Sequence, residues 1–157
     1  MSDIEVSRVI KASPETLYDM VSDLKRMGDL SPENTGGMWI KGATGPEVGA
    51  AFRGTNSSGD RHWATTAIIE QADPGKAFAF RVVVGPVKVA RWGYTFEPVE
   101  GGTKVTETWD DMRGWFAKKA GGFSSGVHDR WTHNRESMED TLLNLSLAAG
   151  KSSATGT

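Results

Sequence analysis

Bulky and polar residues alternate with a period of two in two short runs in the middle of the chain, residues 91–96 and 104–109. The bulky residues of the first run are Trp92, Tyr94 and Phe96, and those of the second are Val105, Glu107 and Trp109. This period is typical of a β-strand with one buried face. The residues between the runs include Pro98, Gly101 and Gly102, which favour a turn. The pattern predicts an antiparallel hairpin with one carboxyl group on an aromatic face.

Similar runs separated by turn residues predict five more strands, which makes seven in all. The predicted strands outside the hairpin cover residues 4–11, 38–43, 51–56, 62–71 and 78–84. Between the first two, Ser13 and Pro14 suit the start of a helix, and Asp23 is expected to cap a second short helix that ends at Gly28.

Apolar residues then recur every three or four positions in a long helix predicted over residues 124–148. Its apolar stripe consists of Val127, Trp131, Asn134, Met138, Leu142 and Leu145. One long amphipathic helix needs one large apolar surface, which predicts an α+β domain over residues 1–148. A curved antiparallel sheet would wrap around the helix, with two short helices between strands one and two. Residues 149–157 are expected to form a disordered polar tail.

Composition narrows the function classes. A chain of 157 residues with a formal net charge of −2 has no basic stripe of the kind that binds nucleic acid. It has no cysteine, which excludes disulfides, thiolate metal sites and thiol nucleophiles. No apolar run approaches the roughly 20 residues of a membrane span, and the N-terminus does not resemble a signal peptide. The expected location is the cytoplasm.

Three motifs resemble the START-like (SRPBCC) superfamily, in particular its polyketide cyclase/dehydrase branch, which also includes lipid-transfer and birch-pollen-allergen-like proteins. The matching segments are residues 13–18, residues 73–80 with Asp73-Pro74-Gly75, and residues 92–96 followed by Gly101-Gly102-Thr103. The resemblance covers approximately residues 2–147. It implies a helix-grip fold with a cavity between the sheet and the long helix that holds a hydrophobic ligand. The superfamily has no common set of catalytic residues, so none is carried over, and no cofactor is expected.

Glu107 is the main candidate for chemistry. A carboxyl group on an aromatic wall should have a raised pKa and could donate or accept a proton, with Tyr94 opposite it in the hairpin. Alternatively, Glu107 forms an ion pair with Arg81 or Arg91, or a hydrogen bond with Tyr94, and only holds the sheet together.

The aromatic residues could line a ligand site or form an ordinary core, and the richness in Trp favours a partly polar cavity. The expected ligand-binding residues are Phe52, Trp63, Phe78, Phe80, Trp92, Tyr94, Glu107, Trp109, Trp131 and Met138. The ligand would be a lipid, a polyketide or an aromatic metabolite, and the protein its carrier or sensor. The alternative is a cyclase or dehydratase that uses Glu107 as acid and base.

The other motifs give weaker evidence for a function. Residues 122–126 match the G-x-S-x-G pattern, but no strand precedes them and the triad partners are not in place, which argues against a hydrolase. Asp129, His133 and Glu136 lie on the charged face of the predicted helix, where a solvated network is expected and a metal site is not. Trp115 and Phe116 could form a lid or contact a partner.

Overall fold

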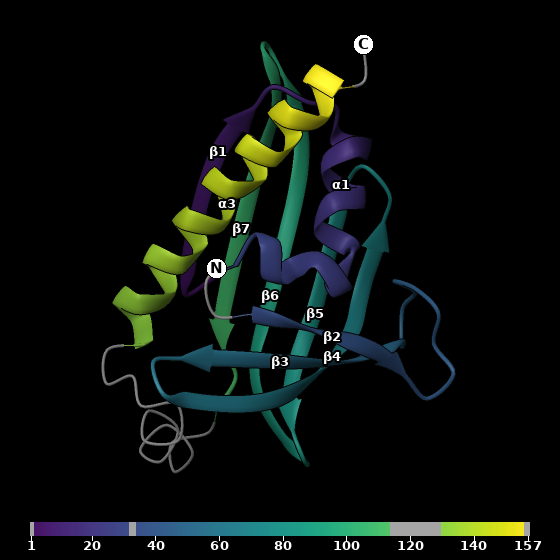
Figure 1. The fold of residues 1–157 in the computed structure, drawn as a ribbon, viewed down its shortest axis with the longest axis vertical. Coiled ribbons are helices and arrows are strands. Elements are labelled where there is room, and N and C mark those ends of the chain that lie inside the picture. The colour runs from purple at the N-terminus through teal and green to yellow at the C-terminus, as the bar shows by residue number, and fades with distance from the viewer. Residues whose placement is uncertain (1, 32–33, 114–129, 156–157) are drawn as a thin grey trace.

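The computed structural model describes residues 2–31, 34–113 and 130–155, which form a sheet with one long helix across it (Figure 1). The elements are β1 (Ile4–Ile10), α1 (Pro14–Ser22), the 3-10 helix η1 (Leu24–Asp29), β2 (Asn34–Ile40), β3 (Ala51–Ser58), β4 (Arg61–Asp73), β5 (Ala77–Val84), β6 (Val87–Val99), β7 (Gly102–Asp111) and α3 (Arg130–Thr155). The described part of the chain therefore confirms the predicted helix-grip α+β fold, with a seven-stranded antiparallel sheet and two short helices between β1 and β2.

The sheet is strongly curved. Its strand order is β1-β7-β6-β5-β4-β3-β2, and all neighbouring strands are antiparallel. The register shifts within β2 near Asn34, within β4 near Ile69 and within β6 at Val89, opposite Val82 and Val83 of β5. Irregularities of this kind bend a strand and increase its twist. As a result, β2 and β3 run across the direction of β6 and β7, and the concave face turns toward the helices (Figure 1).

The β6–β7 hairpin has the register that its alternation predicts. Trp92 pairs with Trp109 and Tyr94 with Glu107, so these four side chains share one face. Both strands are longer than predicted, because pairing continues to Val99 and Gly102 at the turn and to Ala90 and Asp111 at the other end.

The short helices follow their capping signals only in part. The Ser13 hydroxyl accepts a hydrogen bond from the Thr16 backbone N–H at 3.1 Å, as a helix cap should. Asp23 stands at the N-cap position of η1 but makes no side-chain capping bond, so that part of the prediction is wrong. The second helix is a 3-10 helix that ends at Asp29, one residue beyond the predicted end.

Two element boundaries also differ from the prediction. β2 begins at Asn34 and ends at Ile40, so residues 41–43 lie in the turn that follows. α3 continues past the predicted end at residue 148 to Thr155, so residues 149–155, predicted as disordered tail, are helical. The start predicted for this helix lies outside the described residues.

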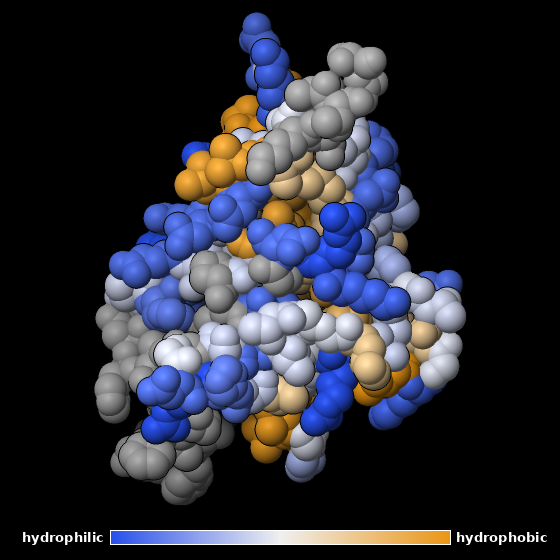
Figure 2. Space-filling view, viewed as in Figure 1, coloured by the Kyte–Doolittle hydropathy of each residue, from blue (hydrophilic) through white to orange (hydrophobic). Residues whose placement is uncertain are grey.

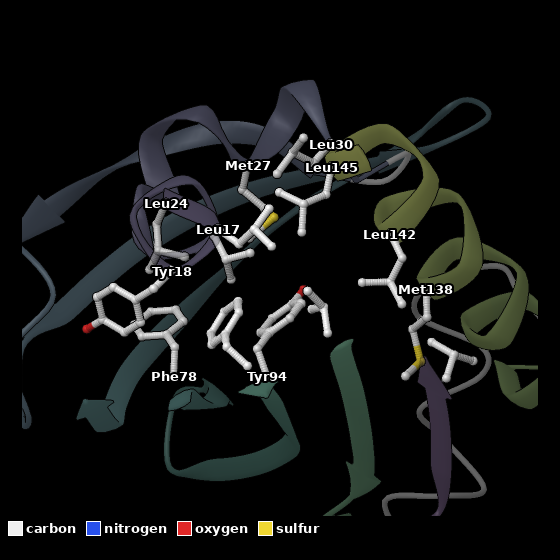
Figure 3. Packing of buried hydrophobic residues seen from close by; sticks show 14 of the residues in the cluster. Leu17, Tyr18, Leu24, Met27, Leu30, Phe78, Tyr94, Met138, Leu142 and Leu145 are labelled. Carbon is white, nitrogen blue, oxygen red and sulfur yellow. The ribbon is translucent and has the colours of Figure 1, made fainter. Parts of the chain in front are cut away.

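The hydrophobic core lies between the helices and the concave face of the sheet. Figure 3 shows Leu17 and Tyr18 of α1 and Leu24 and Met27 of η1 facing the sheet, with Met138, Leu142 and Leu145 of α3 beside them. The side-chain amide of Asn144 donates to the Leu30 carbonyl at 2.7 Å and ties α3 to the end of η1. On the outside, this face is mostly hydrophilic, and hydrophobic residues form small separate patches (Figure 2).

Candidate functional site: a cavity with a buried carboxyl group

A cavity of about 550 Å³ lies on the concave face of the sheet. This is within the range of small-molecule sites, roughly 300–1,000 Å³. Strands β3 to β7 form most of its wall, η1 and the start of β2 close one side, and α3 covers it. The described lining residues are Leu24, Met27, Ser31, Asn34, Phe52, Gly54, Asn56, Trp63, Ala64, Thr65, Ala67, Phe80, Val82, Val84, Val87, Val89, Ala90, Trp92, Tyr94, Glu107, Trp109, Arg113, Asn134, Ser137, Met138 and Thr141.

The structure brings most of the predicted site residues together around this cavity. Those that line it are Phe52, Trp63, Phe80, Trp92, Tyr94, Glu107, Trp109 and Met138. Phe78 does not line it, because its ring packs edge-on against Tyr18 of α1 with the centroids 6.1 Å apart. Phe78 is fully buried there and belongs to the core between the sheet and α1. Trp131 lies in α3, and its side chain is outside the described residues.

Glu107 is 1% exposed and reaches the cavity from the middle of β7. Its side chain forms a hydrogen bond with the hydroxyl of Tyr94, directly across the hairpin. Oε1 of its carboxyl group is buried and has no hydrogen-bond partner among the described residues. Figure 3 shows Tyr94 between Phe78 and the α3 residues Leu142 and Met138, with its hydroxyl pointing away from the sheet.

Burial dominates the electrostatics of this pair. It raises the pKa of Glu107 well above its usual value, and the hydrogen bond from Tyr94 opposes this in part. The pKa of the Tyr94 hydroxyl is also raised well above its usual value, first by burial and then by the nearby carboxyl group. The site therefore favours two neutral groups, each of which can donate and accept a hydrogen bond.

The alternative ion pairs for Glu107 are not formed. The guanidinium groups of Arg81 and Arg91 both contact the carboxylate of Glu70, at 3.3 Å and 3.0 Å. Of the structural roles considered for Glu107, only the hydrogen bond to Tyr94 is present in the described part of the chain.

Arg113 also lines the cavity, but its charge is already matched. Its Nε and Nη2 each donate to one oxygen of Asp111, both at 2.9 Å. The Asp111 side chain is only 3% exposed, and this pairing raises the pKa of Arg113. A paired guanidinium of this kind adds little net charge to the cavity wall.

Sequence reasoning missed several polar residues of the lining, including Thr65 of β4 and Arg113. Both are an even number of positions from a predicted site residue, as expected for side chains on the same face of a strand: Thr65 is two residues from Trp63, and Arg113 is six residues from Glu107. Extending the alternation past Trp109 would have found Arg113. Thr65 also accepts a weak hydrogen bond from the Asn56 amide at 3.4 Å.

The remaining sequence motifs add no site to the described structure. Among the described residues, no group of His, Asp and Glu side chains could hold a metal ion. His133 lies in α3 and has an interaction partner, whereas Asp129 lies outside the described residues. The G-x-S-x-G segment and Trp115 with Phe116 also lie outside them.

The family model described as "Polyketide cyclase / dehydrase and lipid transport" matches residues 1–145. The chain belongs to this family. Its membership agrees with the fold and with a cavity between the sheet and the long helix. Among curated proteins, none matches the chain. No helix in residues 2–31, 34–113 and 130–155 is long and apolar enough to cross a membrane.

Three solved structures show what the family member is similar to. A Polyketide_cyc-like protein from Corynebacterium glutamicum is 29% identical, with a TM-score of 0.58 over 93% of this chain and 87% of its own. The di-domain ARO/CYC StfQ from the steffimycin biosynthetic pathway is 11% identical, with a TM-score of 0.73 over 96% of this chain and 51% of its own. A protein from Thermus thermophilus is 17% identical, with a TM-score of 0.64 over 96% of this chain and 98% of its own. The last two likenesses concern the fold alone.

Proposed function

We propose that this family member binds a small hydrophobic molecule, such as a lipid, a polyketide or an aromatic metabolite, as a carrier or sensor in the cytoplasm. The observation that carries the proposal is the cavity of about 550 Å³, walled by aromatic side chains with one buried carboxyl group. Protein interiors are otherwise close-packed, so a space of this size is unusual unless something fills it. The family's description, which includes lipid transport, supports the same function.

The test has two parts. Native mass spectrometry of freshly purified protein should detect a retained small molecule, and the neutral fluorescent probe N-phenyl-1-naphthylamine should bind saturably with one site per chain. A variant with a narrowed cavity, Ala67→Phe, should bind the probe about ten-fold more weakly, since Ala67 lines the cavity wall. Val9→Phe, which enlarges a side chain that is 56% exposed, is the matched control and should bind normally. Unchanged probe affinity in Ala67→Phe would contradict binding in this cavity.

A second candidate function is a cyclase or dehydratase, and the unpartnered Oε1 of Glu107 favours it. Dehydration of a β-hydroxyketone needs a group that removes a proton from the carbon next to the carbonyl and gives one to the leaving hydroxyl, which departs as water. A carboxyl group with a raised pKa can do both in turn, and Tyr94 would orient it. Glu107→Gln should then abolish turnover while ligand affinity persists. Equal loss of both, or no loss of either, would argue against catalysis.

A further inference from the structure

The buried carboxyl group of Glu107 indicates the chemical class of the ligand. Glu107 lines the cavity and interacts with the Tyr94 hydroxyl, and its buried Oε1 has no hydrogen-bond partner among the described residues. Leaving a buried polar atom unpaired is unfavourable, and the surrounding wall is mostly apolar. A ligand that supplies a hydrogen bond to Oε1 therefore gains more than a pure hydrocarbon of the same shape.

The aromatic wall next to this oxygen shows where the ligand's rings can rest. Trp109 is two residues from Glu107 on the same face of β7, and Trp92 pairs with it across the hairpin, with ring centroids 6.5 Å apart. Two residues along a strand span about 7 Å. A flat ring system on the Trp92–Trp109 pair thus places a substituent at its edge within reach of Oε1.

The charges around the cavity decide between possible substituents. Among the described lining residues, Arg113 carries the only positive charge, and its Nε–Nη2 edge forms a bidentate ion pair with Asp111. A ligand carboxylate would bury a negative charge in a mostly apolar cavity whose one described lining cation is already paired with Asp111. A ligand ammonium would require Glu107 to ionise in a site where burial favours the neutral form. A hydroxyl suits the site best, because it can donate to a carboxylate and can donate to or accept from a neutral carboxyl group.

We propose that the cavity selects a neutral, flat ligand that presents a hydroxyl group to Oε1 of Glu107, and that it discriminates against carboxylates of the same size. This inference rests on the proposed function, since it requires that the cavity bind a ligand at all. It assigns to Glu107 the role of a specificity-determining residue, whether or not the protein also carries out a reaction.

The experiment compares four compounds that share one ring system: 2-methylnaphthalene, 2-naphthol, 2-naphthoate and 2-naphthylmethylammonium. Their dissociation constants are measured by quenching of tryptophan fluorescence and by calorimetry. 2-Naphthol should bind about ten-fold more tightly than 2-methylnaphthalene, a ratio that corresponds to about 1.4 kcal/mol. 2-Naphthoate should bind more weakly than either.

Two variants test whether Glu107 causes the preference for 2-naphthol over 2-methylnaphthalene. In Glu107→Met, which keeps the length of the side chain and removes its hydrogen bonds, the ten-fold preference for 2-naphthol should disappear while 2-methylnaphthalene still binds. Glu97→Met is the matched control, because it removes an exposed carboxyl group from the same hairpin, and it should keep the preference. The comparison of compounds on the unaltered protein tests the proposal even if Glu107→Met does not fold.

The outcomes separate the two proposals. Equal affinity for 2-naphthol and 2-methylnaphthalene, or a preference that survives in Glu107→Met, overturns the assignment of a hydroxyl ligand and leaves the binding function standing. Tightest binding of the ammonium compound overturns it as well, because the site would then recognise charge. Failure of all four compounds to bind, together with failure of N-phenyl-1-naphthylamine, overturns the binding function itself.

Discussion

Replacing Glu107 by glutamine should change how the stability of the ligand-free protein depends on pH. The carboxyl group is 1% exposed, and burial raises its pKa well above the usual value. In an unfolded chain a glutamate has a pKa of about 4.3. The folded protein therefore holds a proton on Glu107 over a pH range in which the unfolded chain has lost it.

The sign and size of the effect follow from this difference. Below about pH 4.3 Glu107 is protonated in both the folded and the unfolded state, so its ionisation does not change the free energy of unfolding. As pH rises toward the raised pKa of the folded state, the unfolded state releases the proton first, so the free energy of unfolding falls. The slope for one proton is about 1.4 kcal/mol per pH unit. For a chain of this size that corresponds to about 3–5 °C in Tm per pH unit.

Urea denaturation followed by tryptophan fluorescence from pH 5 to pH 8 measures the effect, on protein that native mass spectrometry shows to be free of small molecules. The difference in unfolding free energy between the wild type and Glu107→Gln removes the contribution of all other groups, and it should move in favour of the variant as pH rises. Glu100→Gln, which alters an exposed carboxyl group at the turn of the same hairpin, controls for the loss of one charge. Tyr94→Phe should extend the falling region to higher pH, since the hydrogen bond from Tyr94 lowers the pKa of Glu107.

A constant difference between the wild type and Glu107→Gln across this range would refute the reasoning. It would mean that the folded and unfolded states hold the same number of protons on Glu107. The carboxyl group would then be solvated or paired in the folded protein, and both its role as an acid and its preference for a neutral ligand would lose their basis.

Three further predictions test the fold and the division between core and cavity. Phe78→Ala should lower the free energy of unfolding by about 3–5 kcal/mol in urea denaturation and leave the site's probe affinity intact, because Phe78 is fully buried outside the lining. Phe80→Ala should do the reverse, with weaker probe binding in fluorescence titration and a smaller loss of stability, because Phe80 is only half-buried and lines the cavity. Gly102→Ala should cost about 2 kcal/mol or more by thermal denaturation, since Gly102 has a φ of 146° and an added Cβ would overlap the Ile10 carbonyl oxygen. Gly45→Ala, with open space around it, is the control and should be nearly neutral.

Alternation with a period of two predicted the central hairpin well, because the pattern and the turn constrain the same register. With Glu100 and Gly101 at the turn, Val99 pairs with Gly102 and Tyr94 opposes Glu107, as the alternation predicted. The start of β2 could not be found in this way. Gly36 and Gly37 have φ angles of 117° and 155° and carry no side chains, so this strand has no alternating pattern at its beginning.

The distinction between Phe78 and Phe80 shows what alternation cannot determine. Both residues lie on β5 two positions apart, and the sequence predicted the same role for them. Their roles differ because α1 covers the sheet at Phe78, where Tyr18 packs on the ring, and leaves it uncovered at Phe80. Where a helix crosses a curved sheet depends on the bends in several strands together, and no single segment encodes it.

Glu107 and the cavity both reduce the stability of the ligand-free protein, and binding of a suitable ligand would offset both effects. The cavity lacks the packing contacts that a filled core would have, and Glu107 has a buried oxygen without a described partner. Collapse of the walls would restore contacts but leave Oε1 unpaired, whereas water in the cavity would pair the oxygen without filling the aromatic surface. A flat molecule with one hydroxyl group does both, and at a hundred-fold excess over its Kd it would add about 2.7 kcal/mol to the free energy of unfolding. The cavity and the buried oxygen of Glu107 are therefore best explained together, as parts of one binding site.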